Sequence, residues 1–154
     1  MLIFGCGGML RDAVYSLFSK KATVLATDLH PNEEWLSFAD VRDYKSVLKV
    51  TTDFNPDLII NLAALTDLEY CEKNSDDTWL TNALGPENTA LVANQLNVPL
   101  VYISTAGIVD GLQDVYTDFD APNPLSLYAK AKYHGEVFTA SFLKKHFVFR
   151  AGWM

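Results

Sequence analysis

The stretch Leu2-Ile3-Phe4-Gly5-Cys6-Gly7-Gly8-Met9-Leu10-Arg11 decides the fold of this chain. Its first three residues form a short apolar run that predicts a buried strand, and residues 9–20 carry apolar side chains at helical spacing. Glycines between a strand and a helix let the backbone turn tightly and approach a pyrophosphate, which the unpaired N–H groups of the helix N-terminus can bind. A plain tight connection has the same composition, so the turn alone leaves both interpretations open.

The same alternation of strand and helix continues along the chain. Further strands are predicted at 23–27, 57–60, 99–103 and 147–150, and further helices at 43–52, at 76–96 and within 124–145. Strands that alternate with helices of ten or more residues pair in parallel through right-handed crossovers, and apolar strands fit a sheet covered on both faces. We therefore expect one α/β domain over residues 1–154, with a doubly wound parallel sheet.

Composition excludes several classes of protein. The chain has 154 residues, 49% of them hydrophobic, and a net charge of −7, which argues against binding a nucleic-acid backbone. Cys6 and Cys71 form no disulfide framework and no metal-ligand pattern, so we expect buried thiols and no metal site. No apolar run approaches a membrane span, and the N-terminus opens directly into a strand, without the features of a signal peptide. These features predict a cytoplasmic protein without a membrane partner.

Asp28 strengthens the interpretation of the glycine turn as a binding site. It ends the second predicted strand, 20 residues after Gly8. An acid at this place can accept hydrogen bonds from an adenosine ribose, and it repels a 2′-phosphate. The alternative is an ordinary helix-capping or solvated loop acid.

Tyr128 and Lys132 are four residues apart in a predicted helix, so they share one face of it. An ammonium beside a phenol lowers the pKa of the phenol, which would make Tyr128 a usable general acid or base. The strand before this helix ends in Ser104 and Thr105, and hydroxyls at the carboxyl end of a parallel strand can bind a substrate carbonyl. An exposed Tyr–Lys helix face and a loop-capping hydroxyl are the structural alternatives.

The order of glycine turn, hydroxyl strand end and Tyr–Lys helix resembles the extended short-chain dehydrogenase/reductases, and most closely the dTDP-4-dehydrorhamnose reductase family. The resemblance covers the whole chain and implies a Rossmann fold. It lies in these further segments: Asn61-Leu62-Ala63-Ala64, Thr81-Asn82-Ala83-Leu84-Gly85-Pro86-Glu87-Asn88, Ser104-Thr105 with Val109-Asp110-Gly111, Asn123-Pro124 before Tyr128, Gly135-Glu136, and Arg150-Ala151-Gly152-Trp153.

The resemblance also implies roles for individual residues. Tyr128 would donate the proton, Lys132 would hold the nicotinamide ribose and tune Tyr128, and Thr105 would orient the substrate carbonyl. The cofactor implied is NAD(H) or NADP(H), with NAD(H) favoured by Asp28. The residues around it would be Gly5, Gly7, Gly8, Met9, Leu10, Asp28, Asp40, Val41, Ala63, Ala64, Asn82, Tyr128 and Lys132.

The chain departs from the family pattern at two places. Arg11 stands where the family has a third glycine, which lets helix and strand pack closely. Arg11 would thus weaken cofactor binding or, alternatively, reach a ribose phosphate. Ala106-Gly107 stands where the family has Asp-Tyr, which leaves the proposed catalytic residues intact and changes the wall on the substrate side.

The resemblance implies NAD(P)H-dependent reduction of a nucleotide-linked keto sugar. Two alternatives stay open: a nucleotide-sugar epimerase or dehydratase of the same superfamily, and a non-catalytic cofactor-binding subunit like the methionine adenosyltransferase β subunit. Family members continue beyond this length with a smaller domain that binds the sugar nucleotide. We therefore expect the 154-residue chain to fold without turning over substrate. A homo-oligomer is compatible with the sequence.

Overall fold

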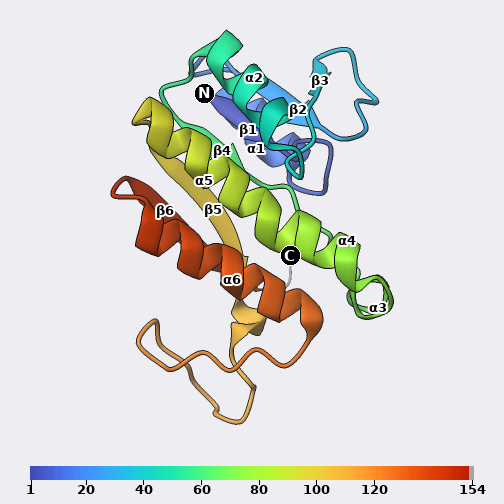
Figure 1. Ribbon diagram of the computed structural model, residues 1–154, viewed down its shortest axis with the longest axis vertical. Coiled ribbons are helices and arrows are strands. Elements are labelled where there is room, and N and C mark those ends of the chain that lie inside the picture. The colour runs from blue at the N-terminus through green and yellow to red at the C-terminus, as the bar shows by residue number, and fades with distance from the viewer. Residues whose placement is uncertain (153–154) are drawn as a thin grey trace.

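The computed structural model describes residues 1–152 and contains one parallel sheet with the strand order β3-β2-β1-β4-β5-β6 (Figure 1). The strands are β1 (Leu2–Phe4), β2 (Leu25–Asp28), β3 (Leu36–Phe38), β4 (Ile59–Asn61), β5 (Leu100–Thr105) and β6 (His146–Ala151). The α-helices are α1 (Arg11–Phe18), α2 (Tyr44–Phe54), α3 (Leu68–Lys73), α4 (Ser75–Trp79), α5 (Gly85–Leu96) and α6 (Leu127–Phe142). The predicted doubly wound, Rossmann-type fold is confirmed.

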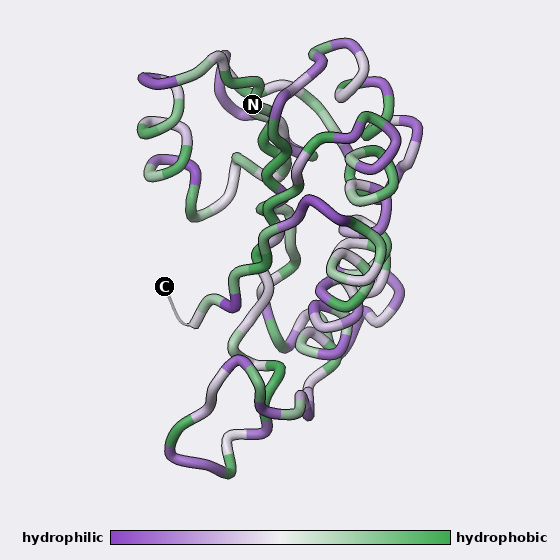
Figure 2. Tube along the Cα trace, turned by 90° about the vertical axis from the view of Figure 1, so that its left-hand side faces the viewer, coloured by the Kyte–Doolittle hydropathy of each residue, from purple (hydrophilic) through white to green (hydrophobic). Residues whose placement is uncertain are grey.

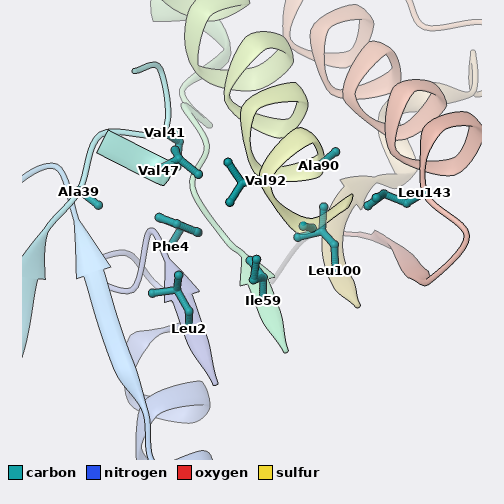
Figure 3. Packing of buried hydrophobic residues seen from close by; sticks show 11 residues of the cluster. Leu2, Phe4, Ala39, Val41, Val47, Ile59, Ala90, Val92, Leu100 and Leu143 are labelled. Atoms are coloured by element: carbon teal, nitrogen blue, oxygen red, sulfur yellow. The ribbon is translucent and has the colours of Figure 1, made fainter. Parts of the chain in front are cut away.

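Two apolar cores lie on opposite faces of the sheet, because successive side chains of a strand point to opposite sides. Leu2 and Phe4 of β1 face α2 and α5, where Figure 3 shows them packed with Ile59 and Val92. Ile3 of the same strand faces the other side and α1. Seen edge-on, the sheet carries α2, α5 and α6 on one face and α1 on the other (Figure 2).

The structure differs from the predicted elements mainly where a segment is short. β3 and α3, of three and six residues, were not predicted, because so few residues show no periodicity. The long helix predicted at 76–96 is observed as one continuous helical run from Ser75 to Leu96. It contains a π-helical turn over Leu80–Leu84. The strand predicted at 23–27 is shifted, since β2 begins at Leu25 and reaches Asp28.

Both cysteines, Cys6 and Cys71, are buried free thiols, as predicted. Within residues 1–152 the structure contains no group of three His, Cys, Asp or Glu side chains arranged to hold a metal ion. In the same part of the chain, every helix is too short or too polar to cross a membrane.

Candidate cofactor and active site

A cavity of about 1160 Å³ runs along the carboxyl ends of the strands. Residues at or just after the end of each of the six strands line it, from Gly5 after β1 to Gly152 after β6. All parallel strands present their carboxyl ends at one edge of the sheet, so residues far apart in the sequence meet there. Most of the predicted site residues line this cavity: Gly5, Gly7, Gly8, Met9, Leu10, Asp28, Asp40, Val41, Ala63, Ala64, Thr105, Tyr128 and Lys132.

The glycine turn owes its shape to two close approaches. Gly5 has φ of +74°, and a Cβ added to it would lie 2.4 Å from the backbone N and Cα of Ala63. A Cβ on Gly7 would lie 2.8 Å from Cγ of Asp28. Gly8 has ordinary room, its first contact being the Gly5 carbonyl oxygen at 3.6 Å. The turn therefore packs against the loop after β4 and the end of β2, and it lies at the N-terminus of α1.

Asp28 is held rigidly at the edge of the cavity. Its carboxylate accepts hydrogen bonds from the backbone N–H of Gly7 at 2.9 Å and of His30 at 3.0 Å. The two bonds engage different carboxylate oxygens and leave each with remaining acceptor capacity. Asp28 therefore has the position and the chemistry to accept ribose hydroxyls.

Arg11, at the place of the family's third glycine, points away from the glycine turn. Its guanidinium lies 3.5 Å from the carboxylates of Glu33 and Asp12, and its side chain is about one-third exposed. Among the described residues that line the cavity, Arg11 is absent. Arg11 is therefore directed toward Glu33 instead of into the cavity.

One charged cluster in the cavity was not predicted from the sequence. Arg42 pairs with Asp40 through contacts of 2.8–3.1 Å, and this hydrogen bonding lowers the pKa of the Asp40 carboxyl. Near it, the Tyr70 hydroxyl donates to Asp77 at 2.7 Å, and Arg42, Tyr70 and Asp77 all line the cavity. In the sequence, the only sign of this pair is that Arg42 follows Asp40 by two residues, and the strand before them, β3, was not predicted. Tyr70 lies on α3, which the sequence did not reveal.

Asn82 supports the cavity from behind instead of lining it. Its side-chain amide donates to the carbonyl of Leu65 and its side-chain oxygen accepts from the Leu65 N–H, both at 2.9 Å. The residue is fully buried in the π-helical turn and is not among the cavity-lining residues within 1–152. Asn82 therefore fixes the loop at 62–66, which does line the cavity, and its expected contact with the cofactor stays a prediction.

Thr105, Tyr128 and Lys132 meet at the opposite end of the cavity from Asp28. Thr105 ends β5, and its hydroxyl oxygen accepts the N–H of Gly107 at 3.1 Å. With that bond as acceptor, the hydroxyl can still donate its own hydrogen, and Tyr128 is within its reach. Burial raises the pKa of Tyr128, and a hydrogen bond with Thr105 partly offsets the rise. Tyr128 therefore holds its phenolic proton at neutral pH, as a proton donor requires.

Lys132 is almost completely buried beneath Tyr128. Its ammonium donates to the carbonyl of Ile103 at 2.5 Å and lies 4.4 Å from the ring centroid of Tyr102. Burial lowers the pKa of Lys132 from 10.5 to about 7. Contrary to the expectation, Lys132 does not lower the pKa of Tyr128 in the structure, because the ammonium is engaged with β5 and burial dominates the pKa of the phenol.

The N-terminus of α6 is capped from two directions, which places Tyr128 in its first turn. The Ser126 hydroxyl accepts the N–H of Ala129 at 3.1 Å, and the Glu72 carboxylate on α3 accepts the N–H of Leu127 at 2.6 Å. Such caps satisfy N–H groups that have no partner within the helix. The short helix α3 therefore helps to orient the helix that carries the Tyr–Lys pair.

The lining of the cavity fits a dinucleotide. At one end, the glycine turn brings backbone N–H groups at a helix start, and Asp28 offers carboxylate oxygens for a ribose. At the other end, Ser104 lines the cavity, and its buried hydroxyl has no hydrogen-bond partner among the described residues. An unpaired buried hydroxyl is costly, so a polar ligand group there would stabilise the site.

Fold and site together define a Rossmann-type domain of the extended short-chain dehydrogenase/reductase kind. The profile of the family described as RmlD substrate binding domain matches residues 1–154, and the chain belongs to that family. One segment that carries the family resemblance, Arg150-Ala151-Gly152-Trp153, ends in Trp153, which lies outside the described residues.

Relatives and solved structures with similarity to the chain are longer than it is. The dTDP-4-dehydrorhamnose reductase of Salmonella typhimurium is 29% identical over 100% of this chain and 51% of its own length. The methionine adenosyltransferase 2 subunit beta of Xenopus tropicalis is 33% identical over 88% of this chain and 41% of its own. A structure of dTDP-4-dehydrorhamnose reductase from Bacillus anthracis in complex with NADP superimposes with a TM-score of 0.89 at 28% identity, covering 99% of this chain and 52% of that one. The chain thus spans about half the length of these relatives.

Proposed function

We propose that the protein containing this chain reduces a keto sugar linked to a nucleotide, with NADH or NADPH as the reductant. One observation carries the proposal: Thr105, Tyr128 and Lys132 lie in the same cavity as the glycine turn. The name of the Salmonella typhimurium relative supports the choice of substrate class. When bound, the nicotinamide supplies a hydride to the carbonyl carbon of the substrate.

The residues of this chain would then complete the reduction. The Thr105 hydroxyl would turn from Tyr128 and donate its hydrogen to the carbonyl oxygen of the sugar, where negative charge develops. Tyr128, protonated at neutral pH because burial raises its pKa, would donate its proton to that oxygen and form the alcohol. Lys132 would bind the nicotinamide ribose from the buried floor of the cavity.

For the cofactor we propose NADH binding at least as tight as NADPH binding. The rigid Asp28 carboxylate favours two free ribose hydroxyls over a 2′-phosphate, which carries like charge. The Bacillus anthracis relative is in complex with NADP, so the preference between NADH and NADPH has to be measured for this chain. Titration of the chain with each dinucleotide measures the preference. NADPH binding clearly tighter than NADH binding would overturn the assignment to Asp28.

The activity is tested by following NADH oxidation with a dTDP-4-keto-6-deoxyhexose, using the complete protein that contains this chain. Tyr128→Phe is expected to lower turnover by about 10²–10⁴-fold, the range for loss of a general acid, while NADH binding stays nearly unchanged. Tyr133→Phe, on the same helix, is the matched control. A Tyr128→Phe variant that keeps most of its turnover would contradict the proposed chemistry.

The similarity to a methionine adenosyltransferase subunit supports a second candidate, a dinucleotide-binding partner protein without turnover. Tight NADH binding with no oxidation in the presence of keto-sugar nucleotides would favour it. We further propose that residues outside this chain clamp the sugar, because relatives are about twice as long. Accordingly, the 154-residue chain by itself is expected to fold and to bind dinucleotide without turnover.

A further inference from the structure

A buried charge network lies behind the Tyr–Lys pair, where α6 packs on β5 and β6 (Figure 1). Glu136 follows Lys132 by one helical turn, so both side chains lie on the buried face of α6. Glu136 is only 7% exposed and Lys132 only 3%. The helix approaches the sheet closely here, since a Cβ on Gly135 would lie 2.8 Å from the hydroxyl oxygen of Tyr102.

Arg150 on β6 forms an ion pair with the carboxylate of Glu136. Its guanidinium contacts the two carboxylate oxygens at 2.7, 3.1 and 3.3 Å, and another of its nitrogens reaches the Asp118 carbonyl at 3.4 Å. In the sheet, Arg150 lies directly opposite Ser104. The neighbour of Ser104 on β5 is Ile103, whose carbonyl oxygen accepts the hydrogen bond from the Lys132 ammonium. The carboxylate thus pairs with Arg150 and belongs to a residue one helical turn from Lys132, which is part of the proposed cofactor site.

We propose that Glu136 is a positioning residue that keeps Lys132 charged for dinucleotide binding, and that Arg150 limits this effect by drawing on the same carboxylate. The inference rests on the proposed function, because it assumes that Lys132 holds the ribose. The alternative is that the Glu136–Arg150 ion pair only holds α6 against β6. That role would account for the contacts of Arg150, but it would not require the carboxylate to belong to the residue one helical turn from a buried ammonium.

The charges around Lys132 support this assignment. Burial lowers the pKa of Lys132 to about 7, and the negative charge of Glu136 acts in the opposite direction. Without that charge, the ammonium would lose its proton at a still lower pH. The titratable or charged groups on the surrounding elements include Tyr102 on β5, Tyr128, Tyr133 and Glu136 on α6, Arg150 on β6, Cys71 on α3, and Asp118 in the loop before α6.

The two partners of the ion pair make opposite predictions. Glu136→Gln removes the negative charge, so the Lys132 titration midpoint is expected to fall by about one pH unit. Arg150→Met frees the carboxylate and removes a positive charge, so the midpoint is expected to rise. If the ion pair served only to hold α6 against β6, both variants would move the Lys132 titration midpoint alike, since each breaks the same ion pair.

The test is an NMR titration of the Lys132 side chain in the 154-residue chain, assigned by comparison with Lys132→Met, alongside NADH titrations at pH 8. We expect the midpoint to move in opposite directions in the two variants, and NADH affinity to fall about tenfold in Glu136→Gln, as a one-unit shift implies. Glu87→Gln is the matched control, since Glu87 on α5 pairs with His134 of α6 outside the cavity.

Each outcome bears on a different claim. Midpoints unchanged in both variants, or moved in the same direction, would overturn the inference even if NADH still binds. Opposite shifts without any NADH binding would support the role of Glu136 in charging Lys132 and contradict the proposed function. If Glu136→Gln does not fold, Arg150→Met decides by itself: a rise supports the inference, and no change or a fall overturns it.

Discussion

The two ends of the cavity are built by different means. The glycine end, Gly5, Gly7 and Asp28, consists of backbone and a short carboxylate in close contact, with no room for a further carbon atom at either glycine. The tyrosine end consists of the buried Thr105 and Lys132 and the half-buried Tyr128, and the pKa values of Tyr128 and Lys132 are shifted. The comparison teaches that the first end depends on shape and the second on protonation, so different perturbations should break them.

The largest effect is expected at the glycine end. Gly5→Ala would place a Cβ 2.4 Å from the Ala63 backbone on a residue with positive φ, so the loop after β4 would have to move. Left-handed strain and overpacking together should lower the free energy of unfolding by about 3 kcal/mol or more. Chemical denaturation measures the loss. Gly8→Ala is the control, because its Cβ would make only an ordinary contact. Equal stability of the two variants would contradict the close-approach account.

The next largest effect belongs to the tyrosine end and depends on pH. The unfolded chain keeps the Lys132 proton up to about pH 10.5, whereas the folded chain releases it near a pKa of about 7. Between these values the unfolded state binds more protons, so the free energy of unfolding contributed by this residue rises with pH.

Lys132→Met should remove that dependence. Measured by denaturation at pH 7, 8.5 and 10, the free energy of unfolding of the wild type should rise relative to Lys132→Met. The expected rise is about 1 kcal/mol per pH unit, somewhat below the limit for one proton. Other titrating groups cancel in the difference between the two proteins. A difference that stays constant over this range would mean that Lys132 keeps its charge despite its burial.

A smaller effect would show whether Asp28 is needed in its observed position. Gly7→Ala would place a Cβ 2.8 Å from the Cγ of Asp28, and the side chain can rotate away at the cost of its bond to the Gly7 N–H. We expect the chain to stay folded and NADH affinity to fall about tenfold, or 1.4 kcal/mol. Asp28→Asn provides a comparison that keeps the shape and removes the charge. Unchanged affinity in Gly7→Ala would show that the carboxylate does not contact the ribose.

The smallest effect is expected at Arg11. Its ion pairs with Asp12 and Glu33 are partly exposed and 3.5 Å long, so Arg11→Gly should lose little from them. Glycine in the first helical turn should cost up to about 1 kcal/mol through helix propensity. The ratio of NADH to NADPH affinity should not change. A preference for NADPH that disappears in Arg11→Gly would instead identify Arg11 as a phosphate ligand.

Local sequence was sufficient where the pattern itself carries the physics. Leu2-Ile3-Phe4 followed by glycines and a helical apolar pattern specifies a strand, a turn and a helix, and the repetition of this unit specifies a parallel sheet. The same logic predicts that Thr105, at the end of β5, lies at this edge, where it lines the cavity together with Tyr128 of α6. It could not find β3 or α3, whose few residues are ordered by their neighbours and show no period of their own.

The sequence by itself therefore determined the doubly wound fold, the edge of the sheet where the cavity lies and a minority of the residues that line it. Only the tertiary structure decided how individual side chains are used. It turned Asn82 toward the Leu65 backbone, directed Arg11 toward Glu33 and buried Lys132 against β5. The physical reason is that spacing along a chain fixes which face a residue occupies, whereas burial, hydrogen-bond partners and pKa depend on elements that are distant in sequence.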